Sequence, residues 1–384
     1  MIHNTTLHSW CLTRYTTTLN MNTTTDTDSQ SQQTERHWRT DLLYEQVYDF
    51  DNLVEAWHEV KKGRRNEIPF LLFAQDEEEI LINLQNELIW HTYKPKKTRE
   101  FIVRDPKMRM ISEPTYYDRI LHHALMRVVE PYFGRYFHRS SFACLTGRGP
   151  LASCLYYQGL IRKAIGRYGK NNFYVVRLDI KSFFASIDRS VLKQQLRRIF
   201  SPTYNESILW LFDSIIDGYV SPDGKGLPLG FLTSQQEANL VNTPLDYYIT
   251  DTLGYSLYCR YMDDVRVLVP TYDDAMNLLY SVDTFIAEKL NLRLSPKKTF
   301  IQRWRGKDTW CGYVVCPHHL EPKKATVARQ KRRIRKKRRM YEAGEITLEE
   351  LKASEQSYIG YLKHTKWQFN CQNNNHAIYY RATS

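Results

Sequence analysis

The segment from Leu257 to Val269 reads LYCRYMDDVRVLV, and its apolar residues alternate with other residues on both sides of two aspartates. The residues that share one parity are Leu257, Cys259 and Tyr261 before the break and Val265, Val267 and Val269 after it. A period of two on both sides of a short polar break predicts a β-hairpin whose turn carries Asp263 and Asp264. The pattern therefore predicts two carboxylates held rigidly at the rim of a sheet.

Two adjacent carboxylates repel each other unless a cation neutralises them, which points to a hard, oxygen-liganded metal such as Mg²⁺. The alternative is an Asp-Asp turn that only faces solvent. A third acid favours the metal, because residues 173–179 (FYVVRLD) predict a buried strand that ends in Asp179. Two strands that bring Asp179 and Asp263 together can hold two Mg²⁺ ions about 3.5–4 Å apart, the arrangement used for in-line phosphoryl transfer.

The composition is that of a globular protein with a polyanionic partner. The chain has 384 residues, of which 42% are hydrophobic and 25% charged, and its formal net charge is +12. No apolar run approaches the roughly 18 residues of a membrane span, and the opening residues lack the pattern of a secretory signal. Nucleic acid is the leading partner for so basic a chain.

The seven cysteines are scattered and contain no Cys-x-x-Cys pair. An odd, unpatterned set predicts a reducing, cytoplasmic setting rather than a disulfide framework. The stretch from Cys311 to His319, CGYVVCPHH, invites a zinc interpretation. Its spacing matches no common structural zinc site, and Cys311 lies in an apolar, strand-like run, so the sequence favours a role without metal.

Three regions differ in composition. Residues 1–38 are rich in Thr, Asn, Ser and Gln and predict a disordered segment, with Met21 as a second candidate start of translation. Residues 39–320 carry helical and strand-like patterns. Residues 321–384 open with a basic run, since eleven of the seventeen residues from Lys323 to Arg339 are Lys or Arg. A localisation signal is the alternative for that run. A second helix is expected over 346–362, with a capping-box-like start at Thr347.

The elements expected within 39–320 alternate irregularly, which favours an α+β layout over a doubly wound sheet. Short strands are expected within 101–114 and a buried strand at 173–179. Helices are expected within 40–93 and over 117–137, 192–200, 208–216 and 282–290, with one more from the glycine-rich turn 223–230 through 239.

Five motifs resemble, in the same order, those of reverse transcriptases. They are LDIKSFFASID (178–188), GLPLG through SQ (226–235), YMDD (261–264), LSPKKT (294–299) and WCGY (310–313). A single Tyr-x-Asp-Asp is weak, but five ordered motifs over more than a hundred residues are specific. The resemblance covers about residues 40–370. It implies a right-hand polymerase that copies RNA into DNA, with fingers, a palm built on an antiparallel sheet and a short helical thumb.

The resemblance also implies roles for the acids. Asp179 and Asp263 match the essential metal ligands, and Asp264 and the backbone carbonyl of Ile180 support them. The implied cofactor is a pair of Mg²⁺ ions, for which Mn²⁺ can substitute. One ion activates the primer 3′-hydroxyl and the other neutralises the triphosphate.

Other positions match residues that contact nucleotides or nucleic acid. Phe184 matches the steric gate, an aromatic ring that clashes with a 2′-hydroxyl; the alternative is a core phenylalanine. Lys298 matches a lysine proposed to protonate pyrophosphate, although Lys297 is adjacent. The other nucleotide-binding candidates are Lys107, Arg109, Leu229, Gly230 and Gln235. The nucleic-acid-binding candidates are Arg148, Trp310, Gly312, Tyr313, Arg332, Arg335 and Lys336. We interpret His122 and His123, within an apolar helix, as structural.

The second motif indicates a subclass. Leu229-Gly230 and Ser234-Gln235 stand where retroviral-like and many group II intron enzymes carry Gln-Gly and Ser-Pro. This pattern resembles diversity-generating retroelement reverse transcriptases, as do DPK (105–107), SFAC (141–144) and SYIGYLKH (357–364). Those enzymes copy a template-repeat RNA with errors opposite adenine, and a small basic accessory protein is a usual partner. Because Leu229 cannot make the hydrogen bonds of a glutamine, we expect it to contribute to misincorporation.

Two features depart from that subclass. Leu145-Thr146 replaces an expected basic pair, and Phe231 stands where a small or polar residue is commoner. A defence-associated or unclassified bacterial reverse transcriptase is therefore the alternative, and a non-catalytic RNA-binding scaffold is a second one. An RNA–DNA hybrid would be bound through its backbone and shape. Since the sequence ends at Ser384, we expect nicking and priming to come from elsewhere.

Overall fold

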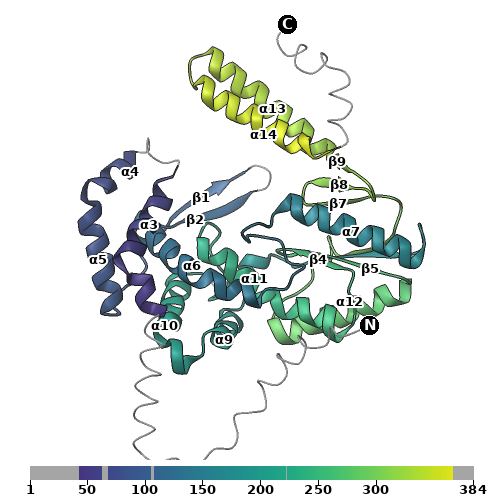
Figure 1. Ribbon diagram of the computed structural model, residues 1–384, viewed down its shortest axis with the longest axis horizontal. Coiled ribbons are helices and arrows are strands. Elements are labelled where there is room, and N and C mark those ends of the chain that lie inside the picture. The colour runs from purple at the N-terminus through teal and green to yellow at the C-terminus, as the bar shows by residue number, and fades with distance from the viewer. Residues whose placement is uncertain (1–42, 63–67, 105–107, 222, 366–384) are drawn as a thin grey trace, which may run out of the picture.

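The computed structural model describes residues 43–62, 68–104, 108–221 and 223–365 (Figure 1). The predicted disordered segment 1–38 and the nucleotide-binding candidate Lys107 lie outside these residues. Helices pack around three antiparallel sheets in the described part of the chain, and the expected α+β class is confirmed. None of the helices found there is long and apolar enough to cross a bilayer.

A four-stranded antiparallel sheet lies at the centre, in the order β4-β5-β3-β6. Its strands are β3 (Tyr174–Asp179), β4 (Tyr258–Tyr261), β5 (Asp264–Val269) and β6 (Phe300–Arg303). The predicted hairpin is confirmed as β4 and β5, and the predicted buried strand as β3. Successive side chains of a strand point to opposite faces, so Val176 and Val267 enter the main core while Val175 and Leu268 enter a second, smaller core.

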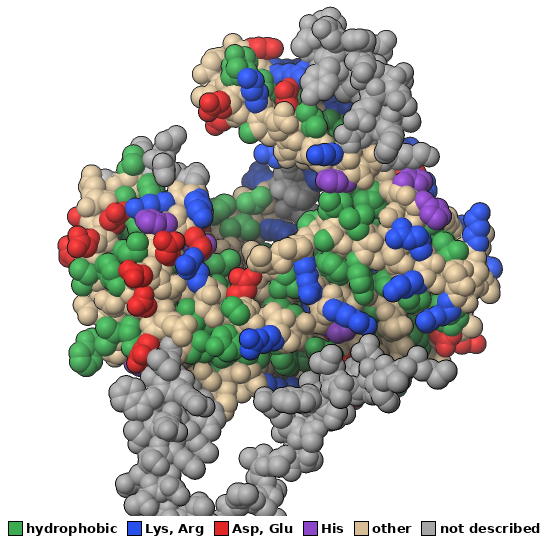
Figure 2. All heavy atoms as spheres, in the orientation of Figure 1, with side chains coloured by type: hydrophobic (Ala, Val, Ile, Leu, Met, Phe, Trp, Pro, Cys, Tyr) green, Lys and Arg blue, Asp and Glu red, His purple; other side chains and the backbone are tan. Residues whose placement is uncertain are grey.

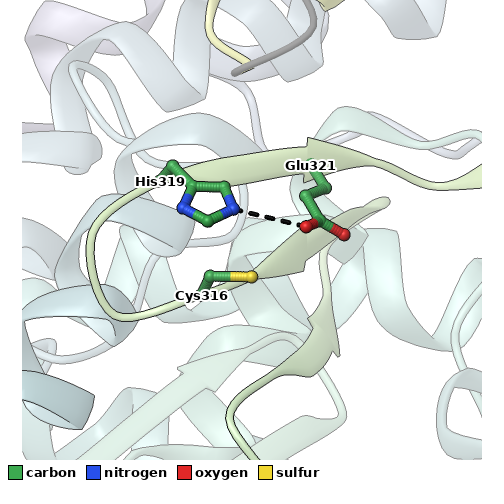
Figure 3. Close-up of side chains that lie close together, drawn as sticks. All are labelled: Cys316, His319 and Glu321. Atoms are coloured by element: carbon green, nitrogen blue, oxygen red, sulfur yellow. Dashed lines mark hydrogen bonds and ion pairs between the residues drawn. The ribbon is translucent and has the colours of Figure 1, made fainter.

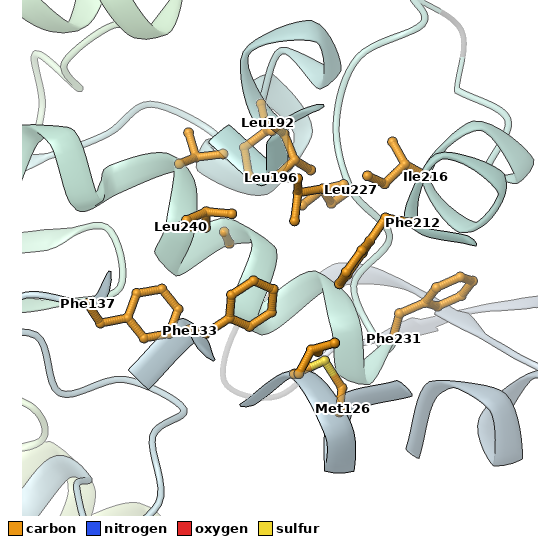
Figure 4. Packing of buried hydrophobic residues seen from close by; sticks show 14 of the residues in the cluster. Met126, Phe133, Phe137, Leu192, Leu196, Phe212, Ile216, Leu227, Phe231 and Leu240 are labelled. Carbon is orange, nitrogen blue, oxygen red and sulfur yellow. The ribbon is translucent and has the colours of Figure 1, made fainter. Parts of the chain in front are cut away.

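The central sheet and five helices contribute to the main core, which also includes buried residues of the N-terminal helices. The five helices are α6 (Tyr116–Tyr136), α9 (Arg189–Ile199), α10 (Pro202–Gly218), α11 (Leu232–Tyr247) and α12 (Tyr272–Leu290). Phe133 of α6 packs against Phe212 of α10 with ring centroids 5.9 Å apart, and Leu240 of α11 belongs to the same cluster (Figure 4). A short π-helix, η3 (Tyr248–Thr252), extends α11.

An N-terminal helical layer flanks this core. It contains α3 (Phe50–Lys61), α4 (Ile68–Phe73), the turn η2 (Ala74–Asp76) and α5 (Glu77–Ile89). The two strands expected within 101–114 form a hairpin, β1 (Arg99–Val103) and β2 (Arg109–Glu113), that projects beside it (Figure 1). All five residues of β1 are exposed.

The second core lies on the opposite face of the central sheet. It is covered by α7 (Pro150–Tyr168) and by a three-stranded sheet of β7 (Asp308–Trp310), β8 (Tyr313–Val315) and β9 (Leu320–Pro322). We did not expect α7 from the sequence, although its buried residues Tyr157, Leu160, Ile161 and Ala164 have the spacing of one helix face. Pro150 occupies its first turn, where the missing N–H costs nothing.

The C-terminal helices α13 (Lys324–Glu342) and α14 (Leu348–Lys363) form an antiparallel hairpin that stands away from the rest of the molecule (Figure 1). A capping box between Thr347 and Glu350 begins α14, as predicted. Ile334 of α13 and Leu351 and Tyr358 of α14 are buried. The space-filling view shows a hollow bordered by this hairpin and by the two lobes of the body (Figure 2).

Candidate active site

The register of the central sheet brings the predicted acids together. Asp179, the last residue of β3, lies directly opposite Asp264, the first residue of β5. Directly opposed residues of an antiparallel pair project from the same face with Cβ atoms about 4.5–5.5 Å apart. Like charges in that position destabilise a sheet unless something neutralises them. Two carboxylates that the sequence separates by 85 positions therefore share one edge and one face.

The third acid, Asp263, occupies the turn between β4 and β5. Tyr261 pairs with Asp264, which leaves Met262 and Asp263 as a two-residue turn. Met262 has a φ of 58°, a left-handed conformation that the first central position of tight hairpin turns requires and that glycine usually supplies. A methionine there stores local strain, so the surrounding structure must hold the turn in place.

A buried polar network holds that turn from behind. The Met262 carbonyl accepts hydrogen bonds from the Arg260 guanidinium (3.1 Å) and from the Asn242 amide (3.2 Å). Arg260 is paired with Asp246 through two bonds of 2.6 Å and 2.5 Å, and both side chains are fully buried. Tyr258 also donates to Asp246. Helix α11 thus reaches the acidic turn through a chain of charged and amide groups.

A cation contacts Asp179. The Lys298 Nζ lies 2.7 Å and 2.6 Å from the two carboxylate oxygens, and this pairing raises the pKa of the lysine. The loop that carries it wraps the end of β3, because Ser295 N–H donates to the Asp179 carbonyl at 2.7 Å. Ile180 forms an isolated bridge with Leu294 just beyond. The structure thus places Lys298 at the acids, while Lys297 is not paired with Asp179 in any contact described.

Negative charge is concentrated at this edge. Burial, helped by the charges of Asp264 and Asp179, raises the pKa of Asp263 to about 6. On the same face behind Asp264, Arg177 and Arg266 are both bound to the buried Asp308. The single Asp308 carboxylate thus binds two guanidinium groups, and Arg177 also interacts electrostatically with Asp264. Three clustered carboxylates, among which Asp263 has a raised pKa, form with Lys298 an oxygen-rich, negatively charged donor set that suits hard divalent ions.

The glycine-rich loop fits between the acidic edge and the projecting hairpin. Leu229 accepts a hydrogen bond from Ser112 N–H of β2 at 2.8 Å through its carbonyl. Gly230 has a φ of 128°, and a Cβ there would lie 2.5 Å from the Ser112 carbonyl oxygen. At the other end of the loop, a Cβ on Gly226 would lie 2.9 Å from the Ala185 carbonyl oxygen. The two glycines permit backbone contacts that any side chain would block.

Phe184 lies beside that loop in α8 (Phe183–Ser186). Its carbonyl accepts from Leu227 N–H at 2.8 Å, and its half-buried ring meets Phe183 edge-on at 5.7 Å. Gln235 is exposed on the first turns of α11, and Arg109 is exposed at the start of β2. The steric-gate candidate Phe184 thus lies between Asp179 and the glycine-rich loop along the chain, and it contacts that loop through its backbone.

The WCGY motif forms the turn between β7 and β8. Trp310 is buried, and its indole donates to Ser153 at 2.7 Å, so its ring supports the turn from inside the core. Gly312 is exposed with a φ of 87°. Its carbonyl accepts from the Tyr361 hydroxyl of α14 at 2.9 Å, and the Tyr361 and Tyr313 rings lie 4.8 Å apart.

The remaining cationic candidates differ in environment. Arg148 donates to the carbonyls of Ser141 (2.7 Å), His138 and Arg139 (both 3.3 Å), so its guanidinium braces that loop. Its contact with template remains a prediction. On α13 the three candidates Arg332, Arg335 and Lys336 are exposed.

Sequence reasoning missed the residues that support the site. Arg260, Asp246 and Asn242 were not among the candidates, nor was Tyr361. A signal was available for Arg260, because an arginine inside an otherwise apolar strand next to two aspartates requires a buried partner. No comparable signal marked Asp246 or Tyr361.

Three carboxylates at the edge of an antiparallel sheet, in a chain that also carries a basic helical hairpin, are features of a right-hand polymerase fold. The profile described as "Reverse transcriptase (RNA-dependent DNA polymerase)" matches residues 94–361. The chain belongs to the reverse transcriptase family.

Two curated proteins of Escherichia coli are similar. Retron Ec73 reverse transcriptase is 27% identical over 185 residues, which cover 45% of this chain and 53% of that protein. Protein YkfC of strain K12 is 24% identical over 280 residues, which cover 63% and 71%. The chain thus spans about half the length of the first relative. Among solved structures, one similar chain is apo telomerase from Candida tropicalis truncated from its C-terminal domain. It is 14% identical with a TM-score of 0.47, and the match covers 59% of this chain and 55% of the telomerase chain.

Proposed function

We propose that this protein is an RNA-directed DNA polymerase whose centre is formed by Asp179, Asp263 and Asp264. The observation that carries the proposal is the register in which Asp179 faces Asp264 with Asp263 in the adjoining turn. In the proposed assignment, residues 39–320 form fingers and palm and residues 321–384 a basic thumb and tail. Template RNA, an RNA–DNA hybrid and dNTPs are the proposed partners.

The three aspartates and the Ile180 carbonyl would hold two Mg²⁺ ions, which supply charge neutralisation for the attacking and leaving oxygens. Other side chains of the protein would position the acids, the sugar and the phosphates. The strained turn at Met262 would fix the Asp263 carboxylate, and Lys298 places an ammonium group beside the acids. Phe184 would limit the space beneath the sugar. The exposed cations of α13 would contact phosphates without reading the sequence.

Primer extension on a primed RNA template with Mg²⁺ and dNTPs tests the proposal. Asp263→Asn should abolish extension, while Asp283→Asn, an exposed aspartate of α12, should leave it unchanged. Both variants should keep the wild-type circular dichroism spectrum. If the wild-type chain binds primed RNA but does not extend it under any of these conditions, the non-catalytic scaffold replaces this proposal.

Within this class, we propose a diversity-generating role in which the enzyme copies a template-repeat RNA with errors opposite adenine, together with a small basic accessory protein. Leu229 supports it, because its side chain cannot hold an incoming nucleotide by hydrogen bonds. In Leu229→Gln, misincorporation opposite template adenine should fall relative to the other three bases. An unchanged error spectrum would contradict this role for Leu229.

A defence-associated bacterial reverse transcriptase is the second candidate, and the similarity to the retron enzyme favours it. The RNA that copurifies with the chain separates the two. A template-repeat RNA copied with errors at adenine supports the diversity-generating role, whereas an unrelated RNA copied with a uniform error rate supports the second candidate.

A further inference from the structure

The hairpin of β8 and β9 carries three metal-ligating side chains on one face. Val314 pairs with Glu321 and Val315 with Leu320, and Cys316 N–H donates to the His319 carbonyl at 3.0 Å. Cys316 and His319 are therefore an opposed pair, and Glu321 lies two residues beyond His319 on the same face. The other face, with Val315 and Leu320, enters the second core. The three side chains converge in Figure 3.

The ligand atoms of this trio have the separations of a metal site. The Cys316 Sγ, one ring nitrogen of His319 and one carboxylate oxygen of Glu321 all lie within 4.8 Å of one another. The His319 Nε2 and the Glu321 Oε1 are 3.3 Å apart. For metal–ligand bonds of about 2.0–2.1 Å, two ligands of a tetrahedral ion lie about 3.3–3.4 Å apart. A hydrogen bond of the same length joins the two side chains without metal, so binding requires only small movements.

We propose that Cys316, His319 and Glu321 bind a zinc ion, with water as the fourth ligand. A thiolate and an imidazole favour a borderline-soft ion over Mg²⁺, and the mixed donor set suits zinc. The site is separate from the aspartates, which offer only hard oxygen donors.

The structure changes the ligand set that the sequence suggested. Cys311, the first cysteine of the stretch, interacts with Cys154 instead, and His318 is exposed in the turn. Glu321, which the cysteine and histidine spacing did not include, takes the third place. The spacing matched no common zinc motif because the ligands are set by hairpin register rather than by two Cys-x-x-Cys units.

The surrounding backbone is already fixed. Gln158 of α7 donates to the Cys316 carbonyl at 2.8 Å, and Arg162 donates to the Pro317 carbonyl at 3.2 Å. Lys307 Nζ lies 4.0 Å from the second carboxylate oxygen of Glu321. Since α13 begins three residues after Glu321, zinc would lock the strand that leads into the basic helix.

The test uses the full chain, stripped with a chelator, loaded with Zn²⁺, dialysed and measured for zinc by mass spectrometry. The wild type should retain one zinc per chain, and Cys316→Ser and His319→Gln should lose it. The matched controls Cys311→Ser and His318→Gln, together with Asp263→Asn, should retain it. Loaded with Co²⁺, the wild type should show a thiolate-to-cobalt charge-transfer band that Cys316→Ser lacks.

Zinc should also raise the melting temperature of the wild type and of the control variants but not that of His319→Gln. Because the His319 ring is partly exposed, its replacement should not prevent folding, so a loss of zinc in this variant would reflect a lost ligand. Binding should weaken as the pH falls, because the thiol and imidazole must release protons. The proposal is overturned if the wild type retains no zinc, or if Cys311→Ser loses zinc while Cys316→Ser keeps it.

Discussion

The buried pair of Arg260 and Asp246 predicts that Asp246→Asn loosens the acidic turn. The substitution keeps the shape of the side chain but removes the countercharge of a guanidinium that has no exposure to solvent. Breaking a buried ion pair costs about 3–5 kcal/mol because the remaining charge is left uncompensated. That is a large share of a total stability of about 5–15 kcal/mol. In a domain of about 300 residues, 4 kcal/mol corresponds to roughly 6 °C in melting temperature.

The loss should extend to activity, because Arg260 and Asn242 are the two side chains that bind the Met262 carbonyl. A displacement of reacting groups by about 1 Å can cost roughly 10²-fold in rate. We expect Asp246→Asn to lower kcat and to raise the Mg²⁺ concentration needed for half-maximal extension. Asn242→Ala should produce a smaller change of the same kind, since it removes a single hydrogen bond of about 0.5–1.5 kcal/mol.

The assays are thermal and urea unfolding and a Mg²⁺ titration of primer extension. Asp213→Asn is the matched control, because Asp213 pairs with Arg197 at the surface, where such pairs contribute about 0–1 kcal/mol. If Asp246→Asn has the same melting temperature as Asp213→Asn and keeps the wild-type Mg²⁺ dependence, the buried network does not hold the turn. A lower melting temperature with an unchanged Mg²⁺ dependence would limit the pair to a structural role.

Four further predictions follow from the same edge and from α13. The fold raises the pKa of Asp263 from 3.8 to about 6, so the free energy of unfolding falls as the pH rises through that range. Without metal, Asp263→Asn should therefore stabilise the chain by roughly 2 kcal/mol above pH 6 in urea unfolding, and should not stabilise it below pH 4. An equal gain at both pH values would contradict this. If Asp179 binds metal, Lys298 would compete for its carboxylate oxygens. Lys298→Met should then tighten Mn²⁺ binding in the absence of substrate, measured by paramagnetic relaxation, even though extension slows. Weaker binding would exclude competition. Phe184→Ala should raise ribonucleotide incorporation relative to deoxynucleotides in single-nucleotide extension, and unchanged selectivity would assign the ring to the core. Replacing the exposed cations Arg332, Arg335 and Lys336 by glutamine should reduce the salt dependence of hybrid binding. The slope of the logarithm of the binding constant against the logarithm of the salt concentration should fall by about 2–3 in magnitude. An unchanged slope would place the hybrid elsewhere.

The sequence predicted the hairpin, the strand ending in Asp179 and the basic helical pair because each is a local pattern. The end of α11 was wrong for a physical reason. Its inner face carries Asn239, Asn242 and Asp246, all fully buried. These polar residues and Pro244 interrupt the pattern, although buried apolar residues continue along the helix to its end at Tyr247. The partners of those polar groups come from β4 and from the turn, and only the folded chain shows them.

The predicted start of α12 was also wrong. The sequence predicted a helix from Val282, whereas the structure begins it at Tyr272 with a capping box between Thr271 and Asp274. The capping box marks the first turn, and the buried Ala275 and Leu278 continue the spacing of Val282 and Ile286, so both signals for the earlier start were present in the sequence. The convergence of Cys316, His319 and Glu321, by contrast, is a product of strand register, which no single spacing reports.

The hydroxyl of Tyr361 has a mechanical consequence. It donates to the Gly312 carbonyl and accepts from Lys323 N–H at 2.9 Å, so the last helix returns to grip both the WCGY turn and the residue before α13. The helical pair is thus fastened at its base, with its far end free of the body (Figure 1). Because Tyr361 joins α14 to the Gly312 turn, we expect a tilt of the far end of the helical pair to displace that turn.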